Sequence, residues 1–448
     1  MPKPLFQSEI QKLHYTGAGQ AMVNNKLTLV PGTIPGDEVQ IDIFKRQKDN
    51  NIGRCVSFIK KSKDRTAHIC DHFPTCGGCQ LIDLPYDKQI EIKTQVLNKA
   101  VKVLYPSLGP KVLPMIPSYD SIHYRNKMDF AFAQDETGIY LGLKKRGAFA
   151  EVVRLKKCFL QSELSNRIRQ HTADFFSEYG LSTWDYTTQA GILRHLVIRE
   201  AKTTNQVLLN LIVSVEHPGI VKKFSDSLTT LFPEITAVYV TINPNKGDAM
   251  ISTELKLLAG NPHIFETFHD LQFRVSPLSF FQTNSHQAVI LYDKIAEMAN
   301  LSSSDTVLDL YCGTGTIGLS MAKRVNQVIG IEENPSATSD AEKNAAANKI
   351  ENITFITGRV KNILKFNSFS PDLVIVDPPR NGMAPKALRR MTELAAKKLI
   401  YVSCNPLTLF NDLKLICEAG YSVKEIQPVD MFPNTFHMET IVRLDLEA

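Results

Sequence analysis

Apolar and polar positions follow two different repeats along this chain. Up to about residue 260, short apolar runs such as 27–30 and 39–44 are broken by Gly and Pro turns, which is typical of β-strands. From about residue 261, apolar runs such as 305–310 and 371–376 alternate with helical stretches such as 316–324. Strand–helix alternation predicts a doubly wound parallel sheet. The expected fold class is therefore α/β, preceded by β-rich segments.

The 448 residues are too many for one hydrophobic core, so we expect three domains. Short strands and basic turns predict an OB-like barrel over 1–62. An α+β domain over 63–260 and the strand–helix domain over 261–448 follow. The segment 85–115 contains a helix that is a candidate to pack on the last domain, so the boundary there is soft.

Charge is distributed unevenly between the domains. Residues 1–65 contain 11 Lys or Arg against 6 Asp or Glu, a surplus of 5, which equals the net charge of the whole chain. This surplus indicates an anionic partner, and nucleic acid is favoured over a merely solvated basic surface.

The sequence predicts a soluble cytoplasmic protein. No apolar run approaches the length of a membrane span, and the start lacks the basic head and apolar middle of a signal peptide. In a reducing compartment, eight cysteines suggest metal binding or catalysis rather than disulfides.

Three of these cysteines, Cys70, Cys76 and Cys79, lie within ten residues, with two glycines between the last pair. Thiolates at such spacing favour an iron–sulfur cluster or zinc. Zinc would take a histidine of the same stretch as its fourth ligand, whereas a cluster would take a distant cysteine, and Cys158 is available. The spacing favours the cluster, and zinc stays open.

A glycine turn from Tyr311 to Gly315 joins the strand at 305–310 to the next helix. Its glycines let backbone approach a ligand at a helix N-terminus. Glu332 closes the following strand, where a carboxylate can accept both hydroxyls of a ribose. The pattern also fits G-x-G-x-x-G through Gly318, so a nicotinamide dinucleotide is a rival ligand.

The next buried strand ends in Asp377, two prolines, Arg380, Asn381 and Gly382. A dehydrogenase has no special use for this loop. S-adenosylmethionine-dependent methyltransferases that act on bases have a D/N-P-P loop here, which frames the base. Arg380 takes the place of the aromatic residue typical of amine-directed enzymes, which argues against methylation of an exocyclic amine.

The apolar run 399–402 predicts another strand, and Pro406 ends it so that Cys404 lies on a turn. Cys404 is either a nucleophile or a small buried hydrophobe. Glu439, before the last strand, is either a general base or surface decoration. Methylation of uracil C5 requires a thiolate that adds to C6, a methyl donor and a base that removes the C5 proton, and together these residues meet that requirement.

Three features of the central region remain unassigned by these motifs. Lys144, Lys145 and Arg146 form a basic tip that is typical of a solvated hairpin. His195 and Arg199 lie on a predicted strand without an identifiable partner.

The chain closely resembles the RNA uracil-C5 methyltransferases, in particular the branch with a TRAM domain and a 4Fe-4S cluster that methylates 23S ribosomal RNA. The resemblance runs nearly from end to end. The motifs that carry it are GAGQAMV with PGTIPGD, C-x5-CGGC with Cys158, SPLSFFQTN, DLYCGTGTIGL, IVDPPRNG, YVSCNP and FPNTFHMET.

The resemblance implies a TRAM barrel, a central α+β domain and a Rossmann-like methyltransferase domain that yields 5-methyluridine. It implies roles for ten residues: Cys404 as nucleophile and Glu439 as proton acceptor; Gln282, Tyr311, Glu332 and Asp377 as contacts of S-adenosylmethionine; Cys70, Cys76, Cys79 and Cys158 as ligands of the 4Fe-4S cluster. Asn434 departs from the His of many relatives, and Thr316 departs from the Asn of some.

Two alternatives stay open. The same reaction on transfer RNA is the nearer one, and a non-catalytic iron–sulfur protein that binds or assembles RNA is the other. Nothing in the sequence requires more than a monomer.

Overall fold

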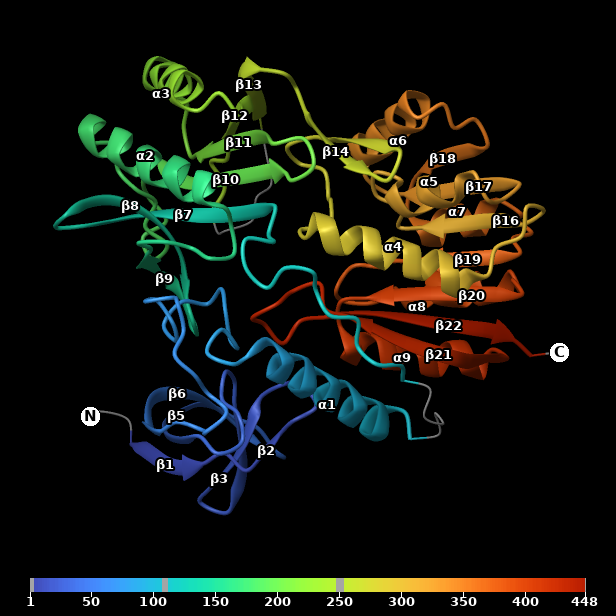
Figure 1. Cartoon of the computed structure of the whole chain (residues 1–448), viewed down its shortest axis with the longest axis horizontal. Helices are drawn as coiled ribbons and strands as arrows, with labels where there is room; N and C mark the ends of the chain where they lie inside the picture. The colour runs from blue at the N-terminus through green and yellow to red at the C-terminus, as the bar shows by residue number, and fades with distance from the viewer. Residues whose placement is uncertain (1–3, 107–111, 247–253, 448) are drawn as a thin grey trace. The chain divides into compact units, whose positions relative to one another are not determined.

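The computed structural model describes residues 4–106, 112–246 and 254–447 (Figure 1). The chain divides into two compact units. The first comprises Met1–Ile69, Cys79–Ser118 and Leu364–Ala448, and the second comprises Cys70–Gly78 and Tyr119–Ile363. These units group the chain differently from the three predicted domains, whose boundaries remain a prediction. Within the described residues, no helix is long and apolar enough to cross a membrane.

The first unit begins with a six-stranded sheet in the order β1-β5-β6-β4-β3-β2 (Figure 1). Its strands wrap around an apolar interior that includes Ile10, Val30 and Ile41. This agrees with the expected β-rich N-terminal region. The strands are β1 (Leu5–Glu9), β2 (Lys12–Leu13), β3 (Gly19–Val23), β4 (Lys26–Val30), β5 (Glu38–Arg46) and β6 (Asn51–Lys60).

Arg65, which the sequence places at the end of a basic cluster, is buried rather than exposed. Its guanidinium lies 2.7 Å from Asp37 Oδ2 and 2.6 Å from Asp83 Oδ1, and all three side chains are at most 1% exposed. Two carboxylates compensate one cation here, so Arg65 joins the sheet to the following segment and adds nothing to a basic surface.

The rest of the first unit contains four strands in the order β19-β20-β22-β21. β19 (Leu373–Val376) and β20 (Lys398–Ser403) are parallel, whereas β22 (Glu439–Leu446) is antiparallel to both β20 and β21 (Tyr421–Val429). The helices of this part are α1 (Tyr86–Leu104), α8 (Pro385–Glu393) and α9 (Pro406–Glu418). The predicted strands at 371–376 and 399–402 and the helix at 87–104 are confirmed.

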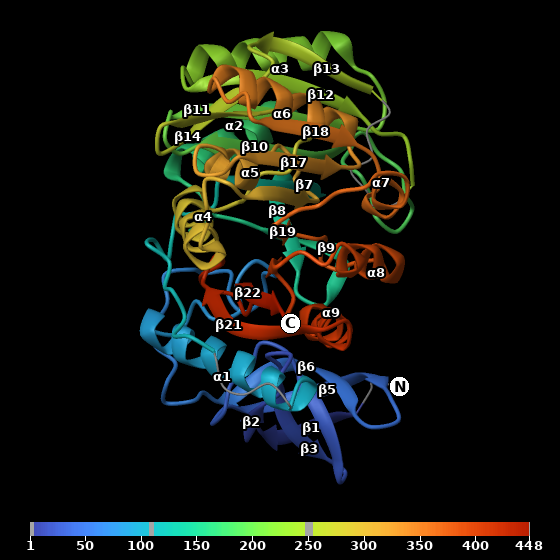
Figure 2. The same cartoon turned by 90° about the vertical axis from the view of Figure 1, so that its right-hand side faces the viewer.

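The second unit contains a seven-stranded sheet in the order β13-β12-β11-β10-β7-β8-β9. Helices α2 (Glu163–Tyr179) and α3 (Pro218–Leu231) lie along one face of it (Figures 1 and 2), where Phe132 of β7 meets Phe176 of α2. The strands are β7 (Lys127–Asp135), β8 (Gly138–Lys145), β9 (Ala148–Arg154), β10 (Leu193–Ala201), β11 (Gln206–Val213), β12 (Ile235–Ile242) and β13 (Glu254–Gly260).

The second unit also contains three parallel strands in the order β18-β17-β16, with helices between them. Each strand ends at the same edge because the strands run in the same direction, and that edge is where ligands bind in open α/β sheets. The elements are the hairpin β14 (Ile264–Phe268) and β15 (Leu271–Val275), α4 (Ser285–Ala299), β16 (Thr306–Leu310), α5 (Thr316–Ala322), β17 (Gln327–Glu332), α6 (Pro335–Ala347), β18 (Ile353–Thr357) and α7 (Val360–Phe366).

Candidate active site

Cys404 lies between the end of β20 and the start of α9. Asn405 caps α9 through its side chain, which accepts a hydrogen bond from the Leu407 N–H at 3.2 Å. Pro406 occupies the first helical turn, where its missing N–H costs nothing. The thiol therefore lies on a turn that is fixed by a strand on one side and by a capped helix on the other, as the sequence predicts.

Glu439 is the neighbour of Cys404 across the sheet. Ser403 of β20 pairs with Thr440 of β22, so the next antiparallel pair brings Cys404 opposite Glu439. Side chains in such a pair have Cβ atoms about 5 Å apart. Glu439 is only 4% exposed, so surface decoration, which is the usual role of a Glu before a strand, is wrong. Its Oε2 atom is buried without a hydrogen-bond partner among the described residues.

The loop after β19 is hydrogen-bonded to the same turn. The carbonyl oxygen of Arg380 accepts hydrogen bonds from Asn405 Nδ2 at 3.1 Å and from Thr408 Oγ1 at 3.2 Å. The Arg380 guanidinium lies 3.0 Å from His437 Nδ1. These bonds hold the Asp377 loop, the Cys404 turn and the segment before β22 together in the first unit.

Burial and negative charge govern protonation in this cluster. Burial raises the pKa of Cys404 to about 11, negative charge on Glu439 and Asp377 acts in the same direction, and Arg380 opposes it. Burial raises the pKa of Asp377 to about 7. Burial, followed by the charge of Asp377, raises the pKa of Glu439 well above its usual value. Without ligands the Cys404 thiol is thus protonated near neutral pH.

A buried lysine holds the segment that leads into Glu439. Lys93 of α1 donates hydrogen bonds to Asp430 Oδ1 at 2.6 Å, to the Phe432 carbonyl at 3.0 Å and to the His437 carbonyl at 2.9 Å. Both Lys93 and Asp430 are fully buried. Sequence reasoning missed this pair, although a lysine that is surrounded by apolar positions on the face of a helix is a signal for it.

Asn434, the residue that departs from many relatives, has a structural role in this segment. Its backbone has a φ of 66°, which Asn tolerates better than most residues. Its N–H donates to Gln89 Oε1 at 2.7 Å, and its side-chain oxygen accepts from Gln89 Nε2 at 3.1 Å. The same helix that contributes Lys93 thus fixes this position as well.

The glycine turn of the second unit has the conformation that its sequence predicts. Tyr311 has a φ of 63°, an uncommon value for a side chain of its size, and Gly313 has a φ of 56° with open space where a Cβ would point. The Glu332 carboxylate accepts hydrogen bonds from the Gly313 N–H at 3.2 Å and from the Asn334 N–H at 2.8 Å. Each of its oxygens keeps a second acceptor position, which suits a ribose diol.

Gln282 is 4% exposed and lies in the second unit, just before α4. Its carbonyl oxygen accepts a hydrogen bond from Asn126 Nδ2 at 2.8 Å, and the neighbouring Thr283 carbonyl accepts one from the Asn126 N–H. These two hydrogen bonds fix the main chain at Gln282.

Three of the predicted cluster ligands, Cys70, Cys76 and Cys158, interact electrostatically in the second unit. Burial raises the pKa of Cys76 to about 11, and negative charge on Cys158 and Cys70 acts in the same direction. The Gly78 N–H donates to Cys76 Sγ at 3.4 Å, and N–H groups of residues 160 and 161 donate to Cys158 Sγ. Such bonds are typical of cluster thiolates. Among the described residues, however, no group of three or more His, Cys, Asp or Glu side chains is arranged so that it could hold a metal ion.

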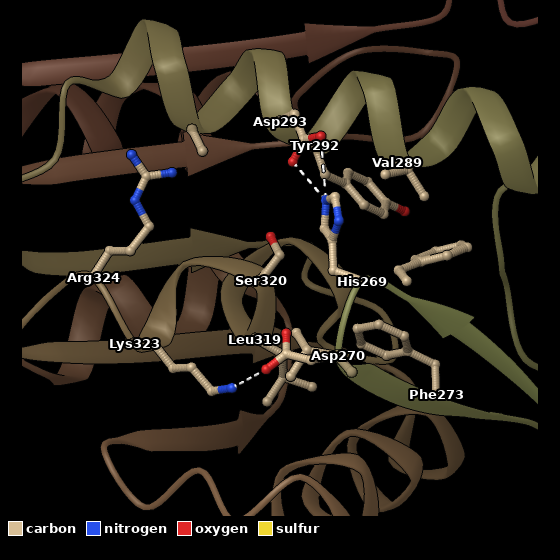
Figure 3. Close-up of a pocket in the computed structure, with 13 residues that line it drawn as sticks. His269, Asp270, Phe273, Val289, Tyr292, Asp293, Leu319, Ser320, Lys323 and Arg324 are labelled. Carbon is tan, nitrogen blue, oxygen red and sulfur yellow. Dashed lines mark hydrogen bonds and ion pairs between the residues drawn. The ribbon is translucent and has the colours of Figure 1, made fainter. Parts of the chain in front are cut away.

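Figure 3 shows a small pocket at the far end of α5 from the glycine turn, lined in part by Ser320 and Arg324. His269 Nε2 lies 2.9 Å from Asp293 Oδ1, and Lys323 pairs with Asp270. The volume of this pocket, about 80 Å³, is far below the roughly 300–1,000 Å³ of typical ligand pockets. We therefore exclude the pocket as the methyl-donor site.

Comparisons with known proteins agree with this fold. The crystal structure of a tRNA (uracil-54, C5)-methyltransferase from Pyrococcus abyssi, in complex with S-adenosyl-L-homocysteine, has a TM-score of 0.78 and 29% identity, and the match covers 98% of this chain and 99% of that one. The fold is thus that of an S-adenosylmethionine-dependent methyltransferase.

Relatives and a family model define the group more closely. An RNA methyltransferase of Caldanaerobacter subterraneus is 36% identical over 98% of both chains, and one of Bacteroides thetaiotaomicron is 35% identical over 96% of this chain and 99% of its own. Residues 266–447 match the family described as tRNA (uracil-5-)-methyltransferase. The chain belongs to the RNA uracil-C5 methyltransferase family, which confirms the family predicted from the motifs.

Proposed function

We propose that this protein transfers the methyl group of S-adenosylmethionine to C5 of a uracil in RNA. The observation that carries the proposal is the position of Cys404 opposite the buried Glu439, which supplies a nucleophile and a base at one point of the sheet edge. The D-P-P loop hydrogen-bonded to the same turn supports it.

In the proposed reaction, the Cys404 thiolate adds to C6 of the uracil, and the ring becomes an enolate. C5 then attacks the methyl group, the C–S bond of the donor breaks, and S-adenosylhomocysteine leaves. Glu439 removes the C5 proton, and elimination releases Cys404. The positive charge of the donor sulfonium would favour the thiolate of Cys404, whose pKa is high in the free protein.

The donor contacts are proposals as well. The Glu332 carboxylate suits the ribose hydroxyls because both of its oxygens keep acceptor capacity. Tyr311, Gln282 and Asp377 complete the proposed set of four. A nicotinamide dinucleotide has no comparable use for Cys404 and the D-P-P loop, so we favour the methyl donor.

We further propose that Cys70, Cys76, Cys79 and Cys158 hold a 4Fe-4S cluster. The buried thiols of Cys76 and Cys158, whose pKa values rise through burial and through negative charge on Cys70, have N–H groups aimed at their sulfurs and suit a positively charged cluster core. Its role would be structural or in contact with RNA, because no step of the proposed reaction moves electrons. We propose a cytoplasmic location, where thiols stay reduced.

The RNA class has two candidates. The motif resemblance favours 23S ribosomal RNA, which the N-terminal barrel, as a TRAM domain, would help to bind. The solved Pyrococcus relative, whose match extends over 98% of this chain, acts on transfer RNA by its description, so the shared architecture is compatible with that substrate too. Mapping 5-methyluridine in ribosomal and transfer RNA of a deletion strain decides between them.

The chemistry is tested with RNA that contains 5-fluorouridine. Fluorine cannot leave as a proton does, so the wild-type protein should form a covalent adduct at Cys404 that is visible by denaturing electrophoresis and mass spectrometry. Cys404→Ser should form neither adduct nor 5-methyluridine. If Cys404→Ser still produces 5-methyluridine, the mechanism is wrong; if Cys404→Ala fully complements a deletion strain, the non-catalytic alternative is supported.

A further inference from the structure

A second cavity in the second unit lies on the face of the seven-stranded sheet opposite α2. Ala131 of β7 pairs with Gly142 of β8 and with His195 of β10, so these three residues point to the same face. Phe132, the next residue of β7, points to the other face and packs on α2. The cavity has a volume of about 480 Å³, within the roughly 300–1,000 Å³ of ligand sites.

The lining of this cavity combines apolar and cationic side chains. Met128, Ala131, Leu143 and Leu160 provide the apolar part. The cationic part consists of Arg125, Lys144, Lys145 and Arg146. The one carboxylate in the lining is that of Asp129. Lys145 also pairs at 2.6 Å with Glu151, which is not part of the lining. The four cations thus exceed the two carboxylates, Asp129 and Glu151, by two charges.

The cationic side of the cavity is held in place by the cysteine loop. The Gly77 N–H donates to the Lys144 carbonyl at 3.0 Å, and the Arg146 N–H donates to the Thr75 carbonyl at 2.9 Å. The Lys144 ammonium lies 2.8 Å from the centre of the Tyr186 ring. The basic tip is a hairpin between β8 and β9 with an exposed Lys145, as expected, but the cysteine loop fixes its backbone and the Lys144 ammonium is buried.

An adjacent hollow of about 390 Å³ continues the same face and is lined in part by Tyr140, Trp184 and Tyr186. The Arg154 guanidinium lies 4.3 Å from the centre of the Tyr140 ring. Proteins that bind single-stranded RNA combine such aromatic and cationic side chains on an open sheet face, where bases stack and phosphates pair with cations.

We propose that the 480 Å³ cavity holds one unpaired nucleotide of the RNA substrate, away from the uracil that is methylated. Its base packs on the apolar lining, and its phosphate lies against Arg146 and Arg125. A free phosphate would leave most of the volume empty, and a purely apolar ligand would not complement the cationic part of the lining. The inference rests on the proposed function, because it takes RNA as the substrate.

The test is a double variant, Arg125→Gln with Arg146→Gln, compared with Lys222→Gln, an exposed lysine of α3 whose side chain is 62% exposed. Binding of a labelled oligouridylate is followed by fluorescence anisotropy over a series of salt concentrations. We expect the double variant to bind about 10-fold more weakly. The slope of log K against log salt should flatten by about 0.7, because one phosphate contact on a single strand is lost. For methylation of ribosomal or transfer RNA, KM should rise by a similar factor, while kcat and the affinity for S-adenosylmethionine stay unchanged.

The outcomes separate this inference from the proposed function. A wild-type protein that binds RNA but never forms 5-methyluridine would contradict the proposed function, and the salt series would still test the cavity. A double variant with the affinity and salt dependence of Lys222→Gln would overturn the inference. If the double variant does not melt cooperatively, Arg146→Gln alone repeats the test, and a smaller flattening of the slope is expected. Inorganic phosphate is the comparison probe: if it binds with equal affinity to wild type and variant, the cations do not form an anion site.

Discussion

The pKa of Cys404 should fall when the negative charge of Glu439 is removed. Glu439→Gln keeps the shape of the side chain and removes its charge. For two charges about 5 Å apart, the interaction is about 3 kcal/mol at an effective dielectric constant of 20, or about 2 pKa units. Cys404 is only partly buried, so we expect solvent to reduce this effect, and the pKa should fall from about 11 by about 1–2 units.

The assay is the rate of alkylation of Cys404 by iodoacetamide as a function of pH, with the modified peptide quantified by mass spectrometry. Only the thiolate reacts, so at pH 8 the wild-type residue should react about a thousandth as fast as a full thiolate. Glu439→Gln should accelerate this reaction about 10- to 100-fold. Arg380→Gln should have the opposite effect, because the Arg380 charge lowers the pKa of Cys404.

Glu418→Gln, at an exposed position in the last turn of α9, is the matched control and should leave the rate unchanged. The reasoning is refuted if Glu439→Gln slows alkylation or if Arg380→Gln accelerates it, since each charge would then act with the wrong sign.

Three further predictions concern stability, the cluster and the donor. Lys93→Met should lower the free energy of unfolding by about 3–5 kcal/mol in a denaturant titration, because it leaves the Asp430 carboxylate buried without its cation. The control Lys88→Met, at the surface of the same helix, should lower it by less than about 1 kcal/mol. Cys158→Ser should abolish the brown absorbance of anaerobically purified protein; a colourless wild type containing zinc would instead support the zinc alternative. Glu332→Gln should weaken binding of S-adenosylhomocysteine about 10-fold by calorimetry, with RNA affinity unchanged, and an equal affinity would remove Glu332 from the donor site.

Local rules predicted the parts of the site that depend on strand ends. The turn at Cys404, the loop at Asp377 and the acid at Glu332 each follow an apolar run, and a proline or glycine marks where each run stops. These features are decided by residues that are neighbours in sequence. For the same reason the α/β class and most strands could be predicted without the structure.

Long-range pairing decided the parts that the sequence did not reveal. Arg65 belongs to the basic N-terminal stretch that the sequence indicates, but Asp37 and Asp83, 28 and 18 residues away, bind its guanidinium in a buried position. Glu439 became significant only when β22 paired with β20 and brought it opposite Cys404. The basic tip at Lys144 became part of a cavity because the cysteine loop, about 70 residues earlier in the chain, binds its backbone. The spacing of apolar and polar residues along the chain does not predict such distant partners.

The buried ammonium of α1 also limits how the enzyme can be divided. The family match begins at residue 266, yet the segment that leads into Glu439 depends on a cation contributed by residue 93. A truncated polypeptide spanning only 266–447 would lack Lys93. The Asp430 carboxylate would then be buried without its cation, and the carbonyls of residues 432 and 437 would lose their hydrogen-bond donor. The smallest autonomous catalytic piece must therefore include the helix from Tyr86 to Leu104, supplied either in the same chain or as a separate complementing peptide.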